Sequence, residues 1–155
     1  MKKILTLALA ALLAVSLCAC SSYFVNHLSK EEVMQICLDN QETLLKDIAE
    51  IDDPQVEKKF QDTVAIDGIM DIGYNSQLVE FNCGSTGAAT KTAPYGFFYS
   101  FDGDLTAPWC CAGTMDDLVE DGDGWSYSPA EGTNDPYYYV EPITGDFYYY
   151  CATYK

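Results

Sequence analysis

A stretch of helical periodicity stands before a long region that has the composition of β-strands. Apolar side chains recur from Val33 to Ile51 with a spacing close to 3.6 residues, and charged or amide residues occupy the opposite face. Ser29 and Glu32 have the spacing of a capping box, in which each side chain accepts a hydrogen bond from the backbone of the other residue. The pattern predicts an amphipathic helix from Lys30 to about Glu50.

The chain beyond this helix has the pattern of short strands separated by turn residues. Pro54 suits the start of a short turn that runs through Phe60. Residues 115–119 are ambiguous, and six other segments are rich in aromatic and β-branched residues or alternate in polarity: 69–74, 77–83, 95–101, 125–127, 137–140 and 147–153. Pro136 and Pro142 bracket one of these segments, which suits an edge strand. The expected fold class is α+β, with the N-terminal helix packed on an antiparallel meander of five to six strands.

The N-terminus has the parts of a secretory signal. Lys2 and Lys3 form a basic head, and residues 4–17 form an apolar run without charge. That run is shorter than the ~20 residues that a membrane-spanning helix needs, which disfavours the alternative of an uncleaved N-terminal helix. We expect residues 1–19 to be a signal peptide.

The end of the apolar run, Leu17-Cys18-Ala19-Cys20-Ser21-Ser22, resembles the lipobox of bacterial lipoproteins. The resemblance implies cleavage after Ala19 and a diacylglyceryl group on the thiol of Cys20. Cys18 is the competing candidate, but it would place Leu17 where a small residue is expected. The alternative is ordinary cleavage near Ala19, which leaves Cys20 as a free thiol. We therefore expect a lipidated tether at 20–28, followed by a single α+β ectodomain at 29–155.

The charge of the chain excludes several classes of partner. There are 24 acidic and 8 basic residues, and the formal net charge of −16 becomes −18 once Lys2 and Lys3 leave with the signal. Nucleic-acid binding needs a basic patch that neutralises phosphates, so no nucleic-acid partner is expected. Adsorption to an anionic membrane face is also disfavoured, so the lipid on Cys20 would have to hold the protein at the membrane.

Five cysteines follow Cys20 in the chain, at positions 37, 83, 110, 111 and 151. An odd number allows at most two disulfides and one free thiol, and export permits disulfides without requiring them. The spacing contains no C-x-x-C, so a zinc or redox site is poorly supported. Which of the five are bridged stays open.

Two aromatic clusters, Tyr137-Tyr138-Tyr139 and Phe147-Tyr148-Tyr149-Tyr150, fall on predicted strands. Side chains alternate along a strand, so each cluster must present rings to both faces of the sheet. If one face is core, the other would display aromatic rings suited to stacking on a sugar or a protein. The candidate binding face comprises Tyr137, Tyr139, Tyr148, Tyr150 and Trp125. The alternative is that tyrosine simply favours half-buried strand positions.

Acidic loops and a glycine-rich segment suggest further sites. Asp117, Asp121 and Asp123 form a candidate weak cation site, although no register of these residues fits an EF-hand, and a hairpin turn is the simpler interpretation. The segment 83–87 could form an anion-binding nest, but it lacks the lysine of a P-loop, and a flexible loop is the alternative. His27 lies in the tether, where a catalytic histidine would not be held by the fold.

A second resemblance covers most of the chain after the leader. It is carried by Leu28–Val33, Tyr95–Ser100, Asp121–Trp125 and the tyrosine-rich C-terminal end. These segments resemble a group of small lipoproteins of clostridia and related Gram-positive bacteria to which no activity can be assigned. The resemblance implies a place on the outer face of a bacterial cell membrane.

From these features we expect a membrane-anchored, surface-exposed bacterial lipoprotein. It would act as a non-enzymatic interaction module without a cofactor, and its partner would be a cell-wall glycan or another surface protein. The alternative is a small enzyme or cation-dependent hydrolase that uses the acidic loops at 102–123.

Overall fold

The structure, a computed structural model, describes residues 27–51, 60, 63, 65–88 and 91–154. The predicted leader, the predicted lipidation site Cys20 and most of the predicted turn at 54–60 lie outside the described residues.

The predicted helix is confirmed as α2, which spans Lys30–Ala49. Both hydrogen bonds of the capping box form. The Ser29 hydroxyl accepts from the Glu32 amide at 3.2 Å, and the Glu32 carboxylate accepts from the Ser29 amide at 2.7 Å. The buried side chains of α2 recur at helical spacing, as an amphipathic helix requires: Val33, Cys37, Leu44 and Ile48.

The described residues also form seven antiparallel strands and a short 3-10 helix, η1, at Met115–Asp117. The strands are β1 (Asp71–Tyr74), β2 (Leu78–Ala88), β3 (Lys91–Ser100), β4 (Val119–Asp121), β5 (Gly124–Tyr127), β6 (Tyr137–Thr144) and β7 (Phe147–Thr153). Their order across the sheet is β1-β2-β3-β7-β6-β5-β4. The α+β class is therefore confirmed.

The prediction of a five- to six-stranded meander is wrong in two respects. The sheet has seven strands within the described residues, because β4 escaped recognition; it is three residues long and exposed throughout. The sheet is also not a single meander. The chain leaves β3, reaches the far edge at β4, and returns strand by strand until β7 pairs with β3.

The glycine-rich segment 83–87 is neither a nest nor a flexible loop. It continues β2, which pairs with β3 as far as Ala88 and has a bulge at Cys83. A Cβ on Gly84 would lie 2.5 Å from the Tyr95 hydroxyl, so glycine is required for the Tyr95 ring to cross the strand at this position.

Strand β6 is not an edge strand, because β5 and β7 flank it. Pro142 is nevertheless accommodated. The pairing of β5 with β6 ends at Val140, so Pro142 lies where β6 has no neighbour on that side and needs no amide donor there.

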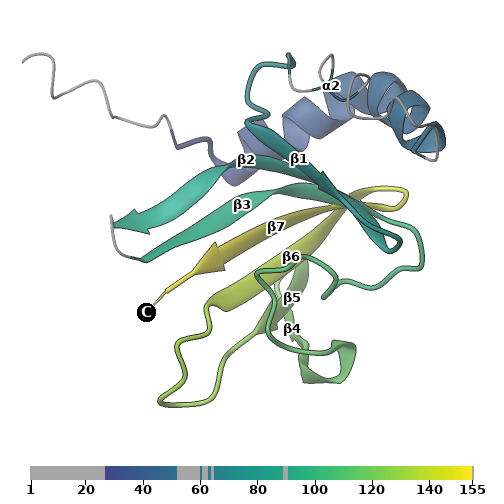
Figure 1. The fold of residues 1–155 in the computed structure, drawn as a ribbon. Coiled ribbons are helices and arrows are strands. Elements are labelled where there is room, and N and C mark those ends of the chain that lie inside the picture. Colours follow the sequence, from purple (N-terminus) through teal and green to yellow (C-terminus); the bar gives the residue numbers. More distant parts are fainter. Residues whose placement is uncertain (1–26, 52–59, 61–62, 64, 89–90, 155) are drawn as a thin grey trace, which may run out of the picture.

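Both faces of the sheet are covered (Figure 1). Helix α2 lies across one face, where Val79, Phe81, Phe97 and Tyr149 pack beneath it. The connection between β3 and β4, residues 101–118, passes over the opposite face and buries a second cluster. That cluster contains Leu78, Phe98, Leu105, Cys110, Tyr138, Val140, Tyr150 and Ala152. The sheet is thus the middle of three layers.

Candidate functional site

A groove of about 620 Å³ lies between α2 and the segment that leads into β1. One wall comes from the start of α2, the other from residues 67–70, and the floor reaches β2. The lining residues are Leu28, Glu32, Gln35, Ile36, Asp39, Asp67, Gly68, Ile69, Met70 and Cys83.

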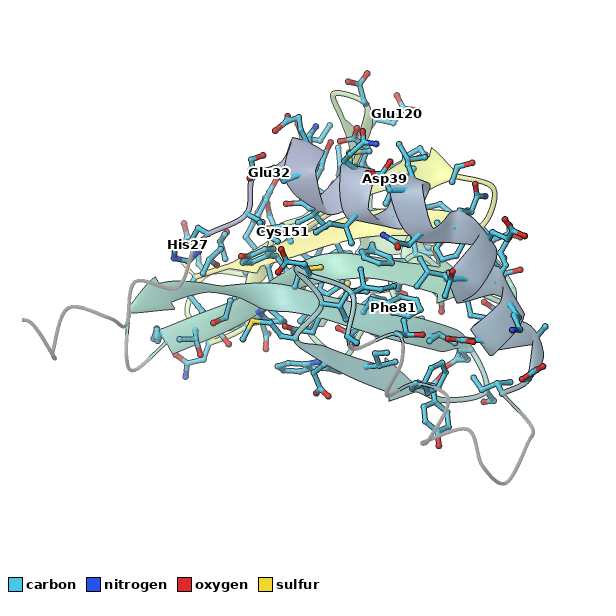
Figure 2. The ribbon with its side chains drawn as sticks, turned by 90° about the horizontal axis from the view of Figure 1, so that it is seen from above. His27, Glu32, Asp39, Phe81, Glu120 and Cys151 are labelled. Carbon is cyan, nitrogen blue, oxygen red and sulfur yellow. The ribbon has the colours of Figure 1, made fainter. Side chains whose placement is uncertain are left out.

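The helical wall follows from the spacing of its residues. Glu32, Ile36 and Asp39 are three or four positions apart, so their side chains line one side of α2. Figure 2 looks down on this helix, with Glu32 and Asp39 on it and Phe81 on the sheet beneath. Glu32 and Asp39 are both exposed, whereas Ile36 is half-buried against the core. The wall therefore combines an apolar base with an acidic rim.

The opposite wall depends on a glycine. Gly68 has φ of +94°, and a Cβ built there would lie 2.4 Å from the Cδ1 atom of Ile36 and 3.2 Å from that of Leu28. A side chain would thus meet both strain and a steric clash. Glycine allows the 67–70 segment to rest directly on α2, and this contact positions Asp67 and Met70 along the groove.

The groove is acidic. Its lining includes the carboxylates of Glu32, Asp39 and Asp67, and none of the described lining residues is basic. The nearest lysine in sequence, Lys30, is engaged elsewhere, since its ammonium lies 2.8 Å from the Glu141 carboxylate on β6. Within the part of the chain that the structure describes, no lysine lines the rim, and the groove favours cationic groups.

The thiols of Cys83, which lines the groove, and of Cys37, which is buried on α2, are unreactive at neutral pH. Burial raises the pKa of both the Cys37 and the Cys83 thiols to about 12, so they remain protonated at neutral pH. A nucleophile or metal ligand needs the thiolate form.

The structure contains no disulfide among the described residues. The five cysteines there are all free thiols: Cys37, Cys83, Cys110, Cys111 and Cys151.

The predicted aromatic binding face does not exist as one surface. Paired residues on neighbouring strands point to the same side of a sheet. By this rule Tyr137 and Tyr139 lie on the face that carries α2, whereas Trp125, Tyr148 and Tyr150 lie on the opposite face. The alternation itself was predicted correctly, but the second face is covered by the 101–118 connection instead of being open.

The tyrosines of this set are also committed to internal contacts. Tyr150 is 0 % exposed, and Tyr148 stacks on Phe98 with ring centroids 5.4 Å apart. The Tyr137 hydroxyl donates to the Asp121 carboxylate at 2.9 Å, and that of Tyr139 donates to the Glu141 carboxylate at 2.6 Å. These contacts favour the alternative that the tyrosines fill half-buried strand positions and do not form a binding face.

Tyr137 does line a second, smaller hollow of about 380 Å³ beside the β5–β6 connection. Lys91, Asp135 and Tyr154 also line it, and the Lys91 ammonium lies 5.6 Å from the centroid of the Tyr154 ring. This lysine already has an aromatic partner, so the hollow has mixed charge and lacks the uniform acidic character of the larger groove.

The predicted cation site is not formed. Among the described residues, no three His, Cys, Asp or Glu side chains gather into a set that could hold a metal ion. Asp117 accepts hydrogen bonds from the backbone and hydroxyl of Thr114, and Asp121 accepts from Tyr137. Asp121 and Asp123 instead flank Gly122 in the turn between β4 and β5, as the simpler interpretation expected.

A buried carboxyl group lies on the face of the sheet opposite α2. Glu80 on β2 is 7 % exposed, and its Oε1 atom accepts a hydrogen bond of 2.5 Å from the Tyr150 hydroxyl. Burial raises the pKa of Glu80, and the hydrogen bond from Tyr150 only partly offsets this effect. Both side chains lie beneath the 101–118 connection and are closed to a substrate, so we assign them to the core.

His27 is exposed and its ring centroid lies 6.2 Å from that of Tyr95. It forms no hydrogen bond to a nucleophile among the described residues, in keeping with its place just before α2.

Sequence reasoning missed the groove, although part of its signal was visible. The spacing of Glu32, Gln35 and Asp39 marks an acidic stripe on one side of α2. The partner segment Asp67-Gly68-Ile69-Met70 has no such mark, and only the folded structure places it against that stripe.

The described residues thus define a three-layered α+β domain with an acidic groove beside its helix. The chain matches no protein-family model, and no curated protein or solved structure shows significant similarity to it. No helix within the described residues is long and apolar enough to span a bilayer.

Proposed function

We propose that this chain is a bacterial lipoprotein, held at the extracytoplasmic face of the cell membrane by lipid on Cys20. We further propose that its ectodomain is a non-enzymatic interaction module. The anchor is supported by the string Leu17-Cys18-Ala19-Cys20-Ser21, which follows a basic head and an apolar run. Two acyl chains on one cysteine suffice for stable anchoring, even though the net charge of the ectodomain opposes adsorption to anionic lipid.

The acidic groove beside α2 is the observation that carries the binding role. Ligand sites in proteins are concave, span ~300–1,000 Å³, and combine apolar walls with a few polar groups. The groove has about 620 Å³, an apolar base at Ile36 and Ile69, and carboxylates at its rim. Its partner would be another surface protein or a cell-wall glycan, and the chemistry of the lining favours the former.

The groove would also lie near the membrane. Leu28 is one of its lining residues. Covalent geometry limits the chain between Cys20 and His27 to a reach of at most about 25 Å. A partner would therefore meet the groove close to the bilayer surface.

The alternative of a hydrolase built on residues 102–123 finds less support. Three carboxylates of this segment accept hydrogen bonds from residues close to them in sequence. Asp102 accepts from the Asp104 amide at 3.0 Å, Asp104 accepts from the Thr106 hydroxyl at 2.7 Å, and Asp117 caps η1. General acid–base chemistry on a substrate needs two such groups facing a common space, and these carboxylates bind their own chain instead.

The anchor is tested by comparing Cys20→Ala with the matched control Cys18→Ala. We expect metabolic labelling with palmitate to disappear in the first variant and to persist in the second, because the lipobox assigns the acyl group to Cys20. Mass spectrometry of the wild-type protein should show an N-terminus at Cys20 with the added mass of a diacylglyceryl group. An unmodified thiol at Cys20, or loss of label only in Cys18→Ala, would refute the anchor as proposed.

A further inference from the structure

We infer that the acidic groove beside α2 binds a basic peptide segment that also carries apolar side chains. This inference rests on the proposed binding role and specifies the chemistry of the partner. The peptide would place apolar side chains against the base of the groove and lysine or arginine side chains along its rim.

The base of the groove offers the apolar half of this recognition. Ile36 and Ile69 pack against the core and present their remaining surface to the groove. Met70 is 61 % exposed, although the apolar side chain of methionine is commonly buried. A flexible thioether adapts its shape to different apolar partners, as at other peptide-binding surfaces. An exposed methionine beside two isoleucines therefore suits aliphatic side chains of a peptide.

The rim of the groove supplies the charged groups that would bind the basic side chains of the peptide. The Asp39 carboxylate accepts one hydrogen bond, from the side-chain amide of Gln35 to its Oδ1 atom at 2.6 Å, and the Glu32 carboxylate accepts one, from the Ser29 backbone amide at 2.7 Å. Each carboxylate can accept further hydrogen bonds through its remaining lone pairs. Asp67 is exposed on the opposite wall. Ammonium or guanidinium groups are the donors that pair most strongly with carboxylates.

The lining argues against other ligand classes. Among the described residues that line the groove none is aromatic, whereas sugar recognition relies on stacking against aromatic rings. An anionic ligand would be repelled by the three carboxylates of Glu32, Asp39 and Asp67. A metal ion is not supported, since the described residues contain no cluster of suitable ligands.

The test uses the mature protein in nanodiscs of phosphatidylcholine, titrated into fluorescein-labelled peptides while anisotropy is measured. The probe is Lys-Leu-Gly-Leu-Lys, and the comparison peptides are Glu-Leu-Gly-Leu-Glu and Lys-Ser-Gly-Ser-Lys. Empty nanodiscs provide the blank. Incorporation into nanodiscs reports the anchor, while anisotropy reports the groove. If the protein fails to incorporate, the same titration is run on the soluble protein, so failure of the anchor and failure of the inference remain distinct.

The decisive variant is Asp39→Asn with Asp67→Asn, because both residues are exposed and neither caps the helix. The matched control is Glu42→Gln with Asp116→Asn, which removes the same charge from exposed positions outside the groove. Exposed ion pairs contribute modestly, so we expect the first pair of changes to weaken binding about three- to tenfold and the control to leave it unchanged. Met70→Ser should weaken binding about fivefold through lost apolar contact.

The inference is supported if only the basic amphipathic peptide binds, if the groove variants weaken it, and if added salt weakens it further. It is overturned if the acidic or serine-containing peptide binds equally well, or if the groove and control variants have the same affinity. It is also overturned if an oligomer of N-acetylglucosamine binds the groove and the basic peptide does not.

Discussion

The buried carboxyl of Glu80 makes the stability of the domain depend on pH in an unusual direction. Its side chain is 7 % exposed and receives a hydrogen bond of 2.5 Å from Tyr150. Because burial raises the pKa of Glu80, the folded state holds this proton more tightly than the unfolded chain does. The resulting stabilisation is fully present below the unfolded pKa of about 4.5 and is lost as pH rises through the folded pKa.

The change Glu80→Gln isolates this contribution. The amide keeps an oxygen that can accept from the Tyr150 hydroxyl and cannot ionise. Between the unfolded and folded pKa values, the wild-type protein should lose up to about 1.4 kcal/mol of unfolding free energy per pH unit relative to the variant. The Gln variant should therefore gain stability relative to wild type as pH rises, even if its packing makes it less stable in acid.

Chemical unfolding followed by tryptophan fluorescence or circular dichroism measures this difference from about pH 4.5 to about pH 8. Glu120→Gln is the matched control. It makes the same change on the exposed strand β4 and should give a curve parallel to that of wild type. A difference between wild type and Glu80→Gln that stays flat across this range would refute the reasoning, as would one that changes in the opposite direction.

Two further predictions concern the other face of the sheet. Lys30→Met should lower the unfolding free energy by about 0.5–1 kcal/mol at neutral pH, since it removes the partner of Glu141, which is only partly screened by solvent. Burial raises the pKa of Glu141, but the hydrogen bonds from Lys30 and Tyr139 outweigh this effect and hold the pKa below its usual value. The loss of stability in Lys30→Met should therefore shrink as pH falls below about 4.5 and Glu141 becomes protonated. A loss of unfolding free energy that stays constant in acid would contradict the ion pair as its cause. Iodoacetamide at mildly alkaline pH should leave Cys37 unmodified in the native protein, because burial raises its pKa to about 12 and blocks access, and peptide mass mapping should find modification only after unfolding. Rapid native-state labelling of Cys37 would show that α2 opens far more readily than its packing implies.

The elements that sequence reasoning predicted correctly are those specified locally. The capping box at Ser29 and the apolar period after it define α2 without reference to the rest of the chain. Most strands were recognisable for the same reason, since alternation and turn residues are local signals. Strand β4 was missed because its three residues, Val119–Asp121, are exposed and gain their strand geometry only from pairing with β5.

The features that could not be predicted depend on which segments meet. Alternation required each tyrosine cluster to point both ways, but it could not show that residues 101–118 would cover the second face. Tyr150 therefore proved to be buried where an exposed ring was expected. The groove depends on the approach of Gly68 to Ile36, a contact between segments that no local pattern relates.

The pairing of β3 with β7 has a consequence for the order in which the domain can form. The central strand of the sheet, β7, follows all the other strands of the described residues in sequence. Tyr95 on β3 pairs with Cys151 on β7, although β4, β5 and β6 lie between them in the chain. Contacts between residues so distant in sequence form slowly, because a large loop must close before they are made. In a protein exported as an unfolded chain, β1–β3 would emerge first, and the edge of β3 would stay unpaired until β7 follows. A truncation that removes β7 would take out the middle of the sheet and leave two half-sheets with exposed edges.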